Sequence, residues 1–147
     1  MDIRQMTAPC GRDCFNCPVY LTKDNPRLRS IIAKRLNIPE EQVQCDGCRN
    51  ENGCIPFLKW TEPCPILTCT ESQSIDFCFE CADFPCDRLH PVVDMADRFP
   101  HNTKVFNLCL IRKMGLEAWA ESKAKKVFNT YMKAKLLDMV LGDKKAE

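Results

Sequence analysis

Apolar residues recur with a helical period in two separate regions of the chain. The first region lies near the N-terminus, where Asp24 or Asn25 can cap a helix that has Pro26 in its first turn. We expect Pro39 to end this helix. Its apolar positions follow the spacing of one helical face: Leu28, Ile31, Ile32 and Leu36.

The second region, residues 89–147, is expected to be helical along most of its length. Three helices are predicted: one over residues 91–99, one from a cap at Asn102 or Thr103 to residue 114, and one over residues 116–141. Gly115 separates the last two. The apolar stripe of the third helix, which includes Trp119, is expected to pack in the core. Apolar residues crowd positions 136–141, which leaves a homodimer through the C-terminal helix as an alternative.

Between these regions, Gly and Pro punctuate the chain. Residues 45–86 contain Gly47, Gly53 and four prolines, so we expect loops and short strands there, with one strand over residues 74–77. The predicted fold class is mainly α, with an irregular, loop-rich cysteine-rich part that metal stabilises. We divide the chain into a cysteine-rich metal-binding lobe, residues 1–88, and a helical lobe, residues 89–147, packed on it as one compact unit.

The number and positions of the cysteines add most to this prediction. The chain has 12 cysteines among 147 residues, and all but Cys109 lie between Cys10 and Cys86. The N-terminus lacks a signal-peptide pattern, and the sequence has no apolar run of membrane-spanning length. We therefore expect a cytoplasmic protein whose thiols are kept reduced. In that compartment, paired cysteines indicate metal ligands or redox centres more than disulfides.

Three C-x-x-C pairs stand out: Cys14/Cys17, Cys45/Cys48 and Cys78/Cys81. Each pair places two sulfurs on one side of a tight turn and can supply half of a tetrahedral zinc site. Cys64 and Cys69 form a looser pair. The sequence predicts about two structural thiolate zinc sites, drawn from ten candidate ligands: Cys10, Cys14, Cys17, Cys45, Cys48, Cys64, Cys69, Cys78, Cys81 and Cys86.

The spacing of the cysteines permits two ways of combining the pairs into four-ligand sites. The preferred one joins Cys45/Cys48 to Cys64/Cys69, and Cys14/Cys17 to Cys78/Cys81. A cross-braced arrangement instead joins Cys14/Cys17 to Cys64/Cys69, and Cys45/Cys48 to Cys78/Cys81. Two cysteines have weaker claims: Cys54 lies in a Gly-containing loop, and Cys109 is expected to be a small buried hydrophobe. Trp60 and Trp119 are expected to be packing anchors.

Two other chemistries remain open. Cys10, Cys14 and Cys17, followed by Pro18, resemble the cysteine runs that bind iron–sulfur clusters, so a cluster protein for electron transfer or redox sensing is the alternative to zinc. A metalloenzyme with an open metal position near Cys10, Cys86, His90 or His101 is the second alternative. The sequence shows no catalytic motif, so an enzyme is not favoured.

A net charge of +1 argues against nucleic acid as the partner. We favour a binding or adaptor module for an unknown protein partner.

The order of the cysteine motifs resembles that of a known family. The motifs are Cys10-Gly-x-x-Cys14-x-x-Cys17-Pro, Cys45-x-Gly-Cys48-Arg, Cys64-x-Ile-x-x-Cys69 and Cys78-x-x-Cys81-x-x-Phe84-Pro-Cys86, followed by Phe99-Pro-His101-Asn102. They are similar to those of an uncharacterised prokaryotic family of short cysteine-rich proteins described as zinc-binding. The resemblance covers about residues 8–125. It implies metal binding at the ten cysteines named above and implies no particular substrate or reaction.

Overall fold

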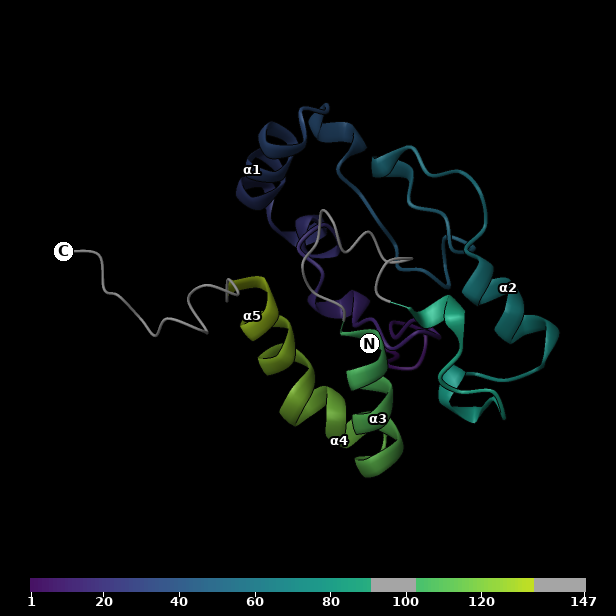
Figure 1. Ribbon diagram of the computed structural model, residues 1–147. Coiled ribbons are helices and arrows are strands. Elements are labelled where there is room, and N and C mark those ends of the chain that lie inside the picture. The colour runs from purple at the N-terminus through teal and green to yellow at the C-terminus, as the bar shows by residue number, and fades with distance from the viewer. Residues whose placement is uncertain (91–102, 134–147) are drawn as a thin grey trace, which may run out of the picture.

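The structure, a computed structural model, describes residues 1–90 and 103–133 (Figure 1). Its α-helices are α1 (Pro26–Leu36), α2 (Pro65–Ser72), α3 (Lys104–Met114), α4 (Leu116–Trp119) and α5 (Lys125–Lys133). Short 3₁₀ turns and loops connect them. Among the described residues, β pairing is limited to isolated bridges, Thr7 with Asp13 and Ile55 with Trp60. The predicted class, mainly helical with a loop-rich part that contains the cysteines, is confirmed.

Helix α1 begins and ends close to where the sequence predicts. The side chain of Asn25 accepts a hydrogen bond from the Leu28 N–H over 2.9 Å, and Asn37 ends the helix in a left-handed conformation, with φ 54°. The predicted apolar face is only partly buried. Ala33 is the buried residue, whereas Ile31 is 42% exposed.

The region between residues 45 and 86 contains a helix that the sequence analysis missed. Helix α2 begins at Pro65, where the first turn needs no N–H from the proline, and Thr70 lies on its buried face. Proline is common both in loops and at the first position of a helix, so Pro65 does not by itself distinguish the two. The predicted strand over residues 74–77 is wrong. Ser74 is left-handed, with φ 54°, and the Ile75 N–H donates to the Thr70 carbonyl oxygen, so this segment closes α2.

The helical region follows the prediction as far as it is described. Helix α3 ends at Gly115, with φ 86°, and α4 follows directly. A π-helical segment, Ala120–Ala124, joins α4 to α5, so one helical run extends from residue 116 to residue 133. Figure 1 shows this run turning back beside α3. The predicted helix over residues 91–99 and the proposed dimer face at 136–141 lie outside the described residues.

One hydrophobic core draws on residues from both ends of the described chain. Met6, Ala8 and Cys10 pack in the same buried cluster as Leu108 and Trp119. The division at residue 88 stays a prediction. Trp119 has no exposed surface, which confirms it as a packing anchor, and its ring meets that of Phe15 edge to face at 5.9 Å.

Trp60 is not a packing anchor. It is 40% exposed, because it closes the small surface turn whose other end is Ile55.

Candidate metal centre

Two C-x-x-C motifs meet in the structure and form what we call the first thiol group: Cys14, Cys17, Cys45 and Cys48. The Cys48 thiol donates a hydrogen bond to the Cys14 sulfur. Cys45 lies close enough to Cys14 and Cys17 that negative charge on either of them raises the pKa of Cys45. Gly47 lies against Cys14 where the two loops meet, since a β-carbon placed on it would lie 3.5 Å from the Cys14 β-carbon. The loops therefore present their sulfurs to one another.

Backbone N–H groups point at three of these sulfurs. The Gly47 N–H donates to the Cys45 sulfur over 3.4 Å, and the Cys48 N–H donates to the Cys14 sulfur. Cys17 Sγ accepts hydrogen bonds from backbone N–H groups just after it in the chain, at Val19 and Tyr20. Donors of this kind stabilise a thiolate more than a neutral thiol. The local backbone is therefore arranged for negatively charged sulfur.

The thiols in this group cannot all ionise without a compensating cation. The hydrogen bond from Cys48 lowers the pKa of Cys14 to about 7. The pKa of Cys48 is raised, because its proton serves that hydrogen bond and its sulfur is buried. Burial raises the pKa of Cys45 to about 11. Without a cation, Cys14 takes the negative charge and its neighbours keep their protons.

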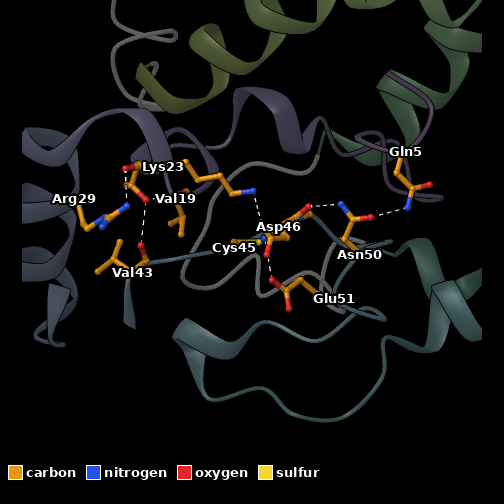
Figure 2. A network of polar contacts seen from close by, with 11 residues as sticks. Gln5, Val19, Lys23, Arg29, Val43, Cys45, Asp46, Asn50 and Glu51 are labelled. Atoms are coloured by element: carbon orange, nitrogen blue, oxygen red, sulfur yellow. Dashed lines mark hydrogen bonds and ion pairs between the residues drawn. The ribbon is translucent and has the colours of Figure 1, made fainter. Parts of the chain in front are cut away.

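The loop that carries Cys45 and Cys48 is braced by polar contacts (Figure 2). Lys23 forms an ion pair with Asp46, and the Asp46 N–H donates to Glu51 Oε1 over 2.9 Å. The Asn50 side chain donates to the Asp46 carbonyl oxygen over 2.8 Å and accepts a hydrogen bond from Gln5. These contacts hold the turn from both flanking segments, so the positions of its sulfurs are restrained.

A second set of contacts in Figure 2 joins the segment after Cys17 to the segment before Cys45. The Thr22 hydroxyl lies 2.7 Å from the Val19 carbonyl oxygen and 3.1 Å from the Val43 carbonyl oxygen. Thr22 and Val43 have no exposed surface. This buried link explains why the two motifs meet although about thirty residues separate them in the chain.

Four other cysteines line a small pocket and form the second thiol group: Cys69, Cys78, Cys81 and Cys86. Helix α2 supplies Cys69, and Cys78 begins the 3₁₀ turn η5 (Cys78–Glu80). Cys86 directly precedes the next 3₁₀ turn, η6 (Asp87–Leu89). Cys78 is buried, Cys69 and Cys81 are partly buried, and Cys86 is exposed. The pocket has a volume of about 30 Å³, room for an ion or a water molecule.

The side chain of Gln73 spans two sulfurs of the second thiol group. Its Nε2 donates to Cys69 Sγ over 3.7 Å, and the Cys81 thiol donates to Gln73 Oε1 over 3.4 Å. Burial and the neighbouring thiols raise the pKa of Cys78 to about 12. Arg88, which also lines the pocket, donates to the Pro65 carbonyl oxygen over 3.1 Å.

Cys10 lies near both groups and Cys64 lies near Cys10, but neither belongs to a group. Cys10 is buried. A negative charge on its sulfur would raise the pKa of Cys48 in the first group and of Cys78 in the second. Burial raises the pKa of Cys10, although Lys104 and Arg12 oppose this shift. Cys64 is a further neighbour of Cys10. Cys64 also packs directly on Gly53, where an added β-carbon would lie 2.5 Å from the Cys64 β-carbon.

Neither predicted combination of motifs matches this arrangement. The structure places Cys14/Cys17 beside Cys45/Cys48, and it places Cys78/Cys81 beside Cys69 and Cys86. The sequence contains no signal for the buried contact between the Thr22 hydroxyl and the Val43 carbonyl oxygen, which joins the two segments of the first thiol group. As they stand, no three Cys, His, Asp or Glu side chains within residues 1–90 and 103–133 form an arrangement that would hold a metal ion. Binding would therefore require thiol side chains to rotate toward one another.

The remaining candidates lie apart from the two groups. The Cys54 thiol donates to the Thr61 carbonyl oxygen over 3.2 Å. Cys109 is exposed, so its expected burial is wrong; the buried stripe of α3 runs through Asn107, Leu108 and Ile111, and Cys109 falls outside it. His90 is exposed at the end of η6, and His101 lies outside the described residues.

The comparison with known families covers the region that holds both thiol groups. Residues 6–91 match the family described as "Protein of unknown function (DUF3795)". The chain belongs to this family. The match spans more than half of the sequence and includes all ten predicted ligand cysteines. No curated protein and no solved structure matches the chain significantly. The expectation of an uncharacterised family is confirmed.

Helices α3 to α5 lie beyond the matched residues, yet they complete the core around this family region through Leu108 and Trp119. Among the described helices, none is long and apolar enough to cross a membrane.

Proposed function

We propose that this chain is a zinc-binding protein in which the two thiol groups hold structural zinc ions. The observation that supports this most is the first thiol group, where two loops place four cysteines near one another and direct backbone N–H groups at three of their sulfurs. Zinc favours four thiolates in a closed structural site, and such a site leaves no open position for catalysis.

Zinc would resolve the charge problem of the first thiol group. On binding Zn²⁺, the four thiols release their protons to solvent, and the resulting site carries a net charge of −2. The N–H donors around Cys14, Cys17 and Cys45 offset part of that charge. Because the four ligands come from two loops, metal binding would also stabilise the fold of those loops.

We further propose that the zinc-stabilised unit serves as a binding or adaptor module for a protein partner. Closed four-thiolate sites shape a surface and do not themselves react. A net charge of +1 does not favour nucleic acid. The predicted homodimer through the C-terminal helix remains a separate prediction about residues beyond 133.

Elemental analysis of protein purified without air tests the metal assignment. We expect about two zinc ions per chain and no visible colour. Cys45→Ser or Cys48→Ser should lower the zinc content by one ion and destabilise the loop between residues 45 and 69. Cys54→Ser is the matched control, since Cys54 lies in the same loop but outside both groups, and it should keep both ions.

Two results would overturn the proposal. A chain that binds no zinc in either purified or reconstituted form would exclude structural zinc. Iron and sulfide together with visible absorption would support the iron–sulfur alternative, and Cys10, Cys14 and Cys17 would then be the first ligands to replace.

A further inference from the structure

The two thiol groups differ in their access to solvent. In the first group, Cys14 is buried and the other three cysteines are partly buried. In the second group, Cys86 is exposed and the sulfurs line a pocket. An incoming ligand must reach a metal in order to remove it, so a metal in the second group would be the easier one to exchange.

The groups also differ in what contacts their sulfurs. Backbone N–H groups, which cannot move without a change in the loop, point at Cys14, Cys17 and Cys45. In the second group, the side chain of Gln73 makes hydrogen bonds with the sulfurs of Cys69 and Cys81. Gln73 is exposed, just past the end of α2, so its side chain can rotate into solvent without changing the backbone.

We propose that the second thiol group is an exchangeable zinc site and that Gln73 is the positioning residue that holds two of its sulfurs while the metal is absent. This inference rests on the proposed zinc-binding function. It distinguishes a permanent structural ion in the first group from an ion in the second group that the protein can take up and give away.

The exchange step balances in protons and charge. When hydrated Zn²⁺ enters, Cys69, Cys78, Cys81 and Cys86 lose four protons to solvent and the ion loses its water ligands, which leaves a site of net charge −2. The hydrogen bond from the Cys81 thiol to Gln73 breaks, and a Cys81–zinc bond replaces it. Arg88 at the pocket wall offsets part of the new negative charge. When a chelator removes the ion, the sulfurs take up protons again.

The test follows zinc transfer to an excess of the chromophoric chelator 4-(2-pyridylazo)resorcinol from the full chain loaded with zinc. We expect two kinetic phases of equal amplitude, a fast one from the second thiol group and a slow one from the first. Cys86→Ser should abolish the fast phase and keep the slow one. Because Cys86 is exposed, this variant is expected to fold; Cys81→Ser provides an independent variant of the same group.

Gln73→Ala tests the positioning role. Gln73 Nε2 can keep its hydrogen bond to Cys69 Sγ once zinc is bound, and loss of such a partner of a metal ligand typically lowers metal affinity about 10–100-fold. The fast-exchanging ion should therefore bind about tenfold more weakly, while the slow phase stays unchanged. Gln42→Ala is the matched control, since Gln42 is an exposed glutamine in another 3₁₀ turn, Glu40–Gln42. Equal affinities in the Gln73→Ala and Gln42→Ala variants would refute the role of Gln73.

The outcomes separate this inference from the zinc-binding proposal. If two zinc ions leave together in one slow phase, the protein binds zinc but the second thiol group is not an exchangeable site. If the fast phase survives in both Cys86→Ser and Cys81→Ser and disappears in Cys45→Ser, the exchangeable ion belongs to the first group. If no zinc is bound at all, the proposed function itself is wrong.

Discussion

Arg49 donates a hydrogen bond from Nη2 to the backbone carbonyl oxygen of Asp76 over 2.7 Å. The same guanidinium donates from Nε to the Thr7 carbonyl oxygen over 2.9 Å and lies 5.4 Å from the centre of the Phe77 ring. Arg49 directly follows Cys48, and Phe77 directly precedes Cys78. One side chain therefore connects the loops that carry the two thiol groups.

Replacing Arg49 with lysine should destabilise the zinc-loaded protein by about 1.5–3 kcal/mol, because hydrogen bonds to charged groups contribute roughly that much. A lysine ammonium keeps the charge but cannot reproduce the planar fork that reaches both carbonyl oxygens. Urea unfolding measures the change. Arg27→Lys is the control, since Arg27 is exposed on α1, and its midpoint should not move. Equal midpoints for both variants would contradict the bracing role.

Gly47→Ala is expected to weaken the first thiol group specifically. Gly47 has φ 94°, a conformation that costs an alanine about 1–3 kcal/mol. Its new β-carbon would also lie 3.1 Å from the Met6 side chain and 3.5 Å from the Cys14 β-carbon. We therefore expect a lower melting temperature and faster release of the slowly exchanging zinc ion.

Gly115→Ala separates these two effects. Gly115 has a similar φ of 86°, but an added β-carbon there would meet no atom within 4 Å. This variant should lower the melting temperature through the backbone conformation alone and should leave zinc release unchanged. If both variants alter zinc release equally, the tight contact with the Met6 side chain has no effect on the metal.

Local signals in the sequence are sufficient for the start of α1 and the end of α3. Asn25 with Pro26 marks the start of α1, and Gly115 marks the end of α3, because capping and positive φ depend on residues that are adjacent in the chain. Helix α2 was missed because Pro65 signals both a turn and a first helical position, and only packing decides between them.

The candidate site could be predicted as a set of cysteines but not as an arrangement. The C-x-x-C spacing identifies which sulfurs share a turn, and this is a local property. Which turns meet depends on distant contacts, such as the Thr22 hydroxyl against the Val43 carbonyl oxygen, that leave no periodic signal in the sequence. The exposure of Cys109 shows the same limit, since one helical position decides whether a small apolar residue faces the core.

Asn107 is expected to be essential for the packing of α3 on the N-terminal region. It is 1% exposed, donates to the Gly11 carbonyl oxygen over 2.8 Å and accepts a hydrogen bond from the Trp119 indole over 3.4 Å. Asn107→Ala leaves both partners buried without a hydrogen bond, and each such loss costs about 1–3 kcal/mol, so we expect about 2–6 kcal/mol less stability.

Asn129→Ala is the control for that loss, because Asn129 is exposed on α5 and its replacement should change stability little. Thermal unfolding compares the two variants. A melting temperature for Asn107→Ala equal to that of Asn129→Ala would show that the buried hydrogen bonds do not hold α3 in place.

Cys86 and Cys109 are both exposed, but only Cys86 lies in a thiol group, so their reactivities should depend differently on metal. In the zinc-loaded chain, Cys109 should react rapidly with Ellman's reagent, whereas Cys86 should be protected as a zinc ligand. Cys109→Ala should remove one fast-reacting thiol and leave the zinc content unchanged. Chelation should then make Cys86 reactive, and Cys86→Ser should abolish that added reactivity. A Cys86 thiol that reacts equally fast with and without zinc is not a ligand, and the second thiol group would then have to hold its metal without it.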